Sequence, residues 1–240
     1  MDLQVLDTGV SSAEENMSLD AKLLEALLPD GRPILHLYEW SRPSATYGHF
    51  IQPEKHLDLD KAKSYNLDLA RRPTGGGIVF HIWDFAFSFL MPANHPRFSL
   101  NTLENYEFVN QAVLEAVRDL LKLKKTPEII PDNMEVKAEG CQNFCMGRPT
   151  QYDVVLDGMK IAGAAQRRRK QGYLHQGTIS LAFPEVKLLE SVLLQKGVLE
   201  AMLAYTFAPL GKIWEPGEIR EARGEIKERL AEKLQEKLNV

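Results

Sequence analysis

The chain has 240 residues, 44% of them hydrophobic and 26% charged, so it can bury a real core and is not disordered. Its formal net charge of −4 argues against a general nucleic-acid binder, because such proteins carry a basic excess. No apolar run approaches the roughly 20 residues of a membrane span, and Met1–Gln4 lack the basic and apolar regions of a signal peptide. Two cysteines, Cys141 and Cys145, do not make a disulfide framework, so we expect a cytoplasmic protein.

The first part of the chain predicts short strands separated by helices. Ser12 and Glu15 match a capping box, in which each side chain accepts a hydrogen bond from the other residue's backbone N–H, so we predict a helix over about 12–28. The other elements expected here are strands over 1–10, 34–40, 45–47 and 67–70, a helix over 58–65, and a fully apolar strand over 85–91.

The second part begins with a helix over about 101–123 and an irregular segment over 124–150, a length that is often functional. Asp157-Gly158 predicts a tight turn between strands over 152–156 and 159–162. The remaining elements are a strand over 173–182 and helices over 186–194, 196–205 and 216–238, the last with charged pairs on a solvated face. We therefore predict an α+β protein, a mixed sheet with flanking helices, forming a single domain over 1–240 in which 183–240 is a helical extension.

The segment Arg71–His81 has the most unusual composition in the chain. Two arginines and a Pro-Thr turn precede three glycines, and an apolar run follows them. Consecutive glycines are useful where a backbone bends sharply or lies against a ligand. Two guanidinium groups beside exposed backbone N–H groups would suit a carboxylate or a phosphate. The alternative is a tight β-hairpin with surface arginines.

Several common sites are not indicated. The chain has no G-x-x-x-x-G-K-[ST] phosphate loop, no complete dinucleotide fingerprint and no G-x-S-x-G elbow. A zinc site on Cys141 and Cys145 would need two more ligands, and the nearest histidine is His175. We predict no metal site.

Cys145 lies in the irregular segment, with Arg148 three residues away and Lys160 on the hairpin that follows. Neighbouring cations stabilise a thiolate, which is the nucleophilic form of cysteine. The alternative is a buried cysteine that acts as a small apolar residue, and Cys141 is interpreted in that way.

Three other features carry polar chemistry. Lys160 stands between small residues, so its ammonium could polarise a carbonyl oxygen, or it could point into water. Residues Arg167–Lys170 are a cationic run in an acidic protein, either a solvated turn or a docking site for an acidic partner. His81 and His175 are individually more typical of satisfied strand histidines than of catalytic bases, and no general base is assigned.

Together, these pieces resemble the lipoate–protein ligase and octanoyltransferase family, which shares its catalytic fold with biotin–protein ligase. The matching motifs are Trp40, Pro43, Gly48 and Gln52, then Arg71–His81, Tyr152–Arg168 and His175–Ile179. The resemblance runs from Asn16 to about Ala182.

The resemblance implies a tunnel for an octanoyl chain, with the arginine–glycine segment beside the acyl group and its carboxyl or acyl-adenylate end. Lys160 matches the family's lysine that contacts the acyl carbonyl. The implied substrate-binding residues are Arg71, Arg72, Thr74, Gly75, Gly76, Gly77, His81, Gly163, Ala165, His175, Gly177 and Thr178.

Two features favour the transferases of this family over its ATP-dependent ligases. Residues 183–240 are too short and too charged for the ligases' accessory domain. In addition, a block of spaced residues resembles the cysteine motif of the LipM and LipL transferases, in which the cysteine carries the acyl group: Cys145, Pro149, Thr150, Tyr152 and Asp153. This chain departs from that motif at Met146-Gly147, where those transferases often have an aromatic residue and an acidic one.

We therefore expect an acyltransferase with Cys145 and Lys160 as catalytic residues and no cofactor. Its donor would be an octanoyl or lipoyl acyl carrier protein. Its acceptor would be the lipoyl domain of a 2-oxoacid dehydrogenase E2 or the glycine-cleavage H protein. The alternatives are a lipoate ligase that uses ATP and Mg²⁺, whole or as a catalytic subunit, and a scaffold that binds lipoyl domains without turnover.

Overall fold

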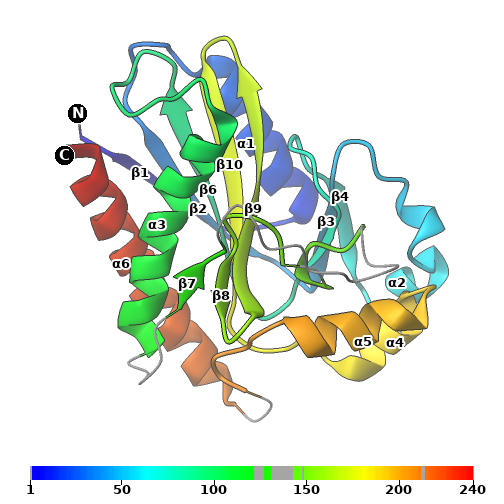
Figure 1. Ribbon diagram of the computed structural model, residues 1–240. Helices are drawn as coiled ribbons and strands as arrows, with labels where there is room; N and C mark the ends of the chain where they lie inside the picture. Colours follow the sequence, from blue (N-terminus) through cyan, green and yellow to red (C-terminus); the bar gives the residue numbers. More distant parts are fainter. Residues whose placement is uncertain (1, 122–126, 131–142, 148, 212–213, 240) are drawn as a thin grey trace.

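The computed structural model describes residues 2–121, 127–130, 143–147, 149–211 and 214–239. Its main layer is a seven-stranded mixed sheet (Figure 1). In spatial order its strands are β1 (Gln4–Ser11), β2 (Ile34–Trp40), β6 (Asp84–Pro92), β10 (Gly172–Ser180), β9 (Met159–Arg169), β8 (Val154–Leu156) and β7 (Glu128–Ile129). Within this sheet, β1 and β2 pair in parallel and the other neighbouring pairs of these strands are antiparallel.

A second, smaller sheet contains β4 (Asp68–Arg71), β3 (Ser44–Tyr47) and β5 (Ile78–His81), in that order. The hairpin alternative for the arginine–glycine segment is therefore wrong, because β3 lies between β4 and β5 and pairs with both. The glycines connect two strands that are not neighbours, so they cross the end of β3 instead of forming a tight turn.

Helices cover both faces of the main sheet (Figure 1). The helices are α1 (Ala13–Ala26), α2 (Leu59–Ser64), α3 (Thr102–Leu121), α4 (Val186–Val192), α5 (Lys196–Tyr205) and α6 (Pro216–Asn239), with short 3-10 turns η1 (Pro53–Lys55) and η2 (Cys145–Gly147). Because both faces are covered, every residue of the central strands β6 and β10 is buried. The predicted mixed sheet with flanking helices is confirmed.

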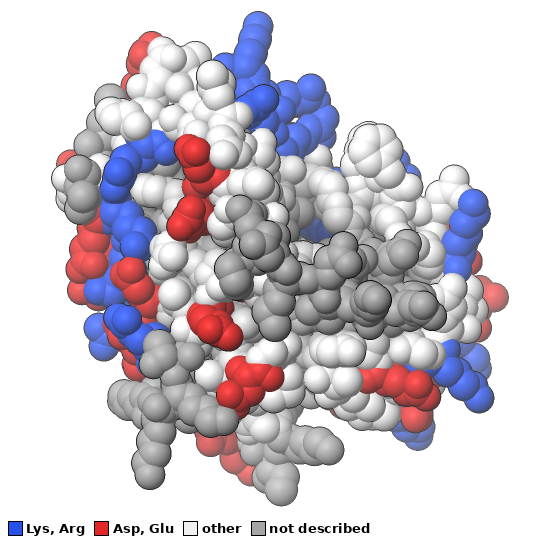
Figure 2. All heavy atoms as spheres, in the orientation of Figure 1, with Lys and Arg blue, Asp and Glu red and all other residues white. Residues whose placement is uncertain are grey.

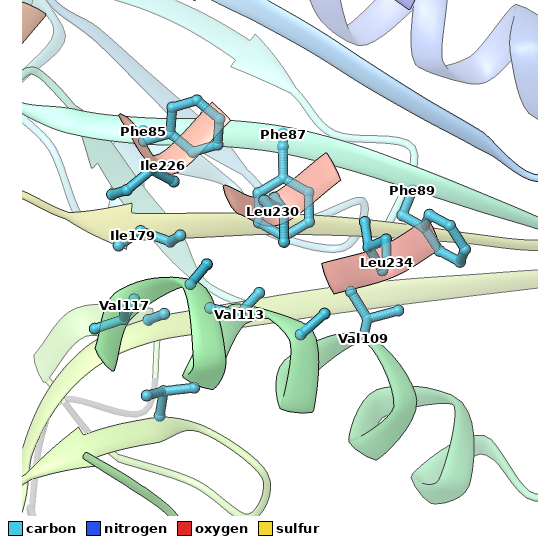
Figure 3. Packing of buried hydrophobic residues seen from close by; sticks show 14 of the residues in the cluster. Phe85, Phe87, Phe89, Val109, Val113, Val117, Ile179, Ile226, Leu230 and Leu234 are labelled. Atoms are coloured by element: carbon cyan, nitrogen blue, oxygen red, sulfur yellow. The ribbon is translucent and has the colours of Figure 1, made fainter. Parts of the chain in front are cut away.

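The largest core lies where α3 and α6 pack together on the sheet. Figure 3 shows Phe85, Phe87 and Phe89 of β6 facing apolar side chains from both helices. In α6 the buried residues recur every three to four positions, so they form one stripe: Ile219, Ala222, Ile226, Leu230, Leu234 and Leu238. The predicted helix over 216–238, with its charged residues on the other side, is confirmed.

Local signals placed several elements correctly. The capping box of Ser12 and Glu15 is present at the start of α1. At the turn from β8 to β9, Asp157 has φ 52° and Gly158 has φ 77°, the positive values that a type I′ turn requires. The short strand β7 and the turn η2 fall in the segment read from sequence as irregular. Among the described residues, no helix is long and apolar enough to span a membrane.

Candidate active site

A narrow cavity of about 30 Å³ lies between the two sheets and opens to solvent. Strands β9 and β10 form one wall, the small sheet forms another, and η2 stands at one side. The lining residues are Met17, Tyr38, Thr46, Arg72, Val79, His81, Cys145, Met146, Lys160, Gly163, Ala164, Ala165, Gln176, Gly177 and Thr178. Residues from segments far apart in the sequence therefore meet at one apolar slot with a few polar groups, which is the usual form of a small-molecule site.

Cys145 opens the turn η2, and its sulfur faces the glycine segment. The backbone N–H of Gly77 donates a hydrogen bond to the Cys145 Sγ at 3.1 Å. Gly76 also lies beside the sulfur, since a Cβ added to that residue would stand 3.4 Å from the Sγ. Thr206, the residue that follows α5, also holds the turn, because its hydroxyl donates to the Met146 carbonyl. The thiol is thus fixed at the wall of the cavity.

Two of the three glycines are required by geometry. Gly76 has φ 85°, a conformation that L side chains rarely adopt. Gly77 touches the backbone that leads into η2, and a Cβ there would stand 2.9 Å from the Phe144 nitrogen. A Cβ on Gly75 would meet nothing within 4 Å. The sequence interpretation of a sharp bend and a close approach holds, although what approaches Gly77 is the cysteine-bearing segment.

Lys160 is buried and points toward η2. Its Nζ lies 2.7 Å from the Asp153 Oδ2 and donates to the Cys145 carbonyl oxygen at 2.9 Å. Asp153 Oδ2 also accepts from the backbone N–H and hydroxyl of Thr150. Gly163 leaves the room for this ammonium, because a Cβ there would stand 2.5 Å from Nζ. The alternative of a lysine pointing into water is wrong.

Arg72 is also buried, in contrast to its exposed neighbour Arg71. Its guanidinium donates to the carbonyl oxygens of Gly75 at 3.0 Å and Gly77 at 2.7 Å, and to Thr46. Burial lowers the pKa of Arg72 below its ordinary value, and the nearby Cys145 opposes that shift. The arginine therefore holds the glycine segment in place and brings a positive charge to the sulfur.

The other predicted residues divide into two groups. His81, Gly163, Ala165, Gly177 and Thr178 line the cavity. Arg71 instead lies over the Tyr47 ring, and Thr74 donates to Gln176 behind the cavity wall. His175 faces α3, because alternate residues of β10 point to opposite sides of the sheet. Cys141 and Arg148 fall outside the described residues.

Sequence reasoning missed several lining residues: Met17, Tyr38, Thr46, Val79, Met146, Ala164 and Gln176. All are apolar or neutral and they stand on several elements. Met17, Tyr38 and Thr46 lie outside the matched motifs, whereas Val79 and Ala164 lie inside them but were not selected. Gln176 lies inside the H-Q-G-T-I motif, between two residues that were selected, and its strand position next to Thr178 was the signal that could have found it.

A family profile described as "Lipoyl protein ligase A/B catalytic domain" matches residues 12–200 of this chain. The chain belongs to this family. It is 31% identical to octanoyltransferase LipM of Halalkalibacterium halodurans, over 77% of this chain and 68% of the relative. It is 33% identical to octanoyltransferase LipM of Anoxybacillus flavithermus, over 75% of this chain and 66% of the relative.

The fold is also that of a solved family member. A bipartite lipoate protein ligase from Thermoplasma acidophilum superposes with a TM-score of 0.69 at 23% identity, covering 100% of this chain and 91% of that chain. The family and fold expected from the motifs are confirmed. The alignments reach about two thirds of the length of the two LipM proteins.

Proposed function

We propose that this protein is an acyltransferase that moves an octanoyl or lipoyl group onto a specific lysine of a lipoyl-domain protein. The curated relatives named octanoyltransferase LipM support this reaction over the ATP-dependent ligase. The observation that carries the proposal is the place of Cys145, whose sulfur faces backbone N–H of Gly77 in the same cavity as Lys160.

In the first step, the Cys145 thiolate attacks the carbonyl carbon of the donor thioester. A new C–S bond forms, the old one breaks, and the carrier leaves as a thiolate that takes a proton from solvent. The negative charge that builds on the carbonyl oxygen would be stabilised by Lys160 and by backbone N–H groups of the glycine segment. In the second step, the ε-amine of the acceptor lysine attacks the acyl-enzyme, an amide forms, and the Cys145 thiolate is released as the amine loses its proton to solvent.

The donor we propose is an octanoyl or lipoyl acyl carrier protein, and the acceptor a lipoyl domain of a 2-oxoacid dehydrogenase E2 or the glycine-cleavage H protein. This reaction needs neither ATP nor Mg²⁺, because the thioester is already activated. The cationic run at the end of β9 would receive an acidic carrier. There a shallow hollow is lined by Leu100, which is 82% exposed, and by three cations: Arg168, Arg169 and Lys170.

The decisive experiment is incubation with octanoyl acyl carrier protein followed by intact mass measurement. We expect an added octanoyl group on the peptide that contains Cys145, its loss in Cys145→Ala, and its transfer to a lipoyl domain added afterwards. A protein that stays unmodified, while Cys145→Ala still lipoylates the acceptor with ATP and Mg²⁺, would instead be a ligase. Binding of the lipoyl domain with no turnover under either condition would indicate the scaffold.

A further inference from the structure

Arg72 is a buried cation, and among the described residues no carboxylate forms an ion pair with it. Its hydrogen bonds go to neutral carbonyl oxygens and one hydroxyl. Burying a charge without a counter-charge is costly, so an anion that forms beside this guanidinium during function would be stabilised by it. The Cys145 thiol, which becomes an anion when it ionises, lies close to the guanidinium, because a Cβ on Gly76 would stand 3.2 Å from the Arg72 Nη2 and 3.4 Å from the Cys145 Sγ.

The other titratable groups around the sulfur are either paired or neutral. The Lys160 ammonium is shared between Asp153 and the Cys145 carbonyl oxygen. The Tyr106 phenol, which α3 brings near the site, accepts from the Gln166 N–H, and burial raises its pKa to about 12. Arg72 is thus the cation among these groups that is left to pair with a thiolate.

Behind Arg72 runs a chain of hydrogen bonds that is buried along its whole length. The Arg72 Nη1 donates to the Thr46 Oγ1 at 2.7 Å, and this oxygen lies 2.8 Å from the His81 Nε2. The His81 Nδ1 lies 2.6 Å from the Asp84 Oδ2, which also accepts from the Thr178 hydroxyl. With the ring proton on Nδ1, every donor in this chain has an acceptor: Arg72 donates to Thr46, Thr46 to His81, and His81 to Asp84.

The packing around this chain removes its freedom to rearrange. The Trp40 ring stacks on His81, with centroids 4.4 Å apart and planes at 26°. Thr46 lies at the centre of the small sheet, where β3 pairs with both β4 and β5. The imidazole therefore sets the direction of the Thr46 hydroxyl, and the hydroxyl lone pairs set the place of the guanidinium.

We propose that Arg72 is the counter-ion of the Cys145 thiolate and that Thr46, His81 and Asp84 are positioning residues that aim it at the sulfur. This rests on the proposed role of Cys145 as the acyl carrier, but it concerns the ionisation of the thiol and not the transfer itself.

The test is the rate at which iodoacetamide alkylates the peptide that contains Cys145, measured from pH 5 to pH 10 without any substrate. Thr46→Val keeps the volume and removes the hydroxyl. We expect it to slow alkylation about tenfold near pH 7, because only the thiolate reacts and loss of its counter-ion lowers the ionised fraction of the thiol. At high pH the thiol is fully ionised in both proteins, so the rates should converge on wild type. His81→Gln should shift the profile in the same direction, and Thr46→Ser should restore the wild-type profile.

A matched control exists in the same molecule. Thr8 lies 2.9 Å from the Nε2 of His36, which in turn contacts Asp20, so it forms a second Thr–His–Asp chain; within the described part of the chain, no hydrogen bond or ion pair joins it to an arginine. Thr8→Val should leave the profile unchanged. A wild-type profile in both Thr46→Val and His81→Gln would overturn the proposal, as would an equal loss of rate at every pH, which indicates a blocked or unfolded site. Failure of octanoyl transfer with an intact alkylation profile would count against the proposed function alone.

Discussion

Gly163 leaves the space that the Lys160 ammonium occupies, and its effect on the site is entirely steric. A methyl group there would collide with Nζ and stand 2.9 Å from the Asp153 Oδ1. The colliding atoms are the mobile end of a long side chain, so the fold can absorb the change while the lysine moves away from η2.

We therefore expect Gly163→Ala to lower kcat for octanoyl transfer about a hundredfold to a thousandfold, the range for loss of one group that stabilises an oxyanion. Its melting temperature should change little, which thermal unfolding would check. Gly224→Ala is the control, because a Cβ at this exposed position in α6 would meet nothing within 4 Å. Full activity in Gly163→Ala would show that the position of Lys160 is not needed for catalysis.

At the scale of elements, strand β10 separates two environments. Gln176 and Thr178 line the cavity, whereas His175 is fully buried beneath α3, with its Nδ1 2.8 Å from the Gln166 Nε2. Burial lowers the pKa of His175 from 6.5 to about 3. The substrate-binding role implied for this histidine by the family motif has no support in its position, since the sheet lies between it and the cavity.

His175 should make stability depend on pH. Its pKa is lower in the folded state, so as pH falls the unfolded chain takes up the proton first; stability is full above pH 6.5 and is lost toward pH 3. Between pH 7.5 and pH 5, wild type should lose about 2 kcal/mol more unfolding free energy than His175→Asn, measured with urea. His49→Asn, in an exposed loop, should keep the wild-type slope. Parallel curves for wild type and His175→Asn would show that the buried ring takes up its proton without cost.

Across the whole molecule, charge is unevenly distributed despite the net charge of −4. Figure 2 shows Lys and Arg side chains gathered at the upper edge, over the end of the sheet where Figure 1 places the β9–β10 turn. This basic edge is continuous with the site, because Arg167 donates to the Pro73 carbonyl of the arginine–glycine segment at 2.8 Å. An acidic carrier docked there would bring its thioester toward the cavity.

Arg168, Arg169 and Lys170 are exposed at this edge, and Arg168 donates to the Leu100 carbonyl. We therefore expect the double variant Arg169→Glu, Lys170→Glu to raise KM for octanoyl acyl carrier protein about tenfold at low salt. KM for a small octanoyl thioester should not change. Lys61→Glu, Lys63→Glu makes the same charge change on α2, away from this edge (Figure 1), and should affect neither donor. An equal rise in KM for both donors would place the defect in the acyl site and not in docking.

Much of the fold follows from local sequence. The Ser12 capping box, the Asp157-Gly158 turn and the apolar stripe of α6 each determine an element through neighbours in the chain. The family motifs pointed to Cys145 and Lys160, and the structure places both residues at one cavity. That each of them acts in catalysis stays a prediction, as does the single domain over 1–240.

The tertiary structure alone decided which side chains share the slot. Arg71 and Arg72 are adjacent and chemically alike, yet one lies on the surface and the other beside the sulfur, because successive residues at the end of β4 point in opposite directions. The route from Thr46 through His81 to Asp84 depends on the insertion of β3 between β4 and β5, a pairing of distant segments that no local pattern encodes. Sequence by itself determined the elements and the family; the sheet pairing determined the electrostatics of the site.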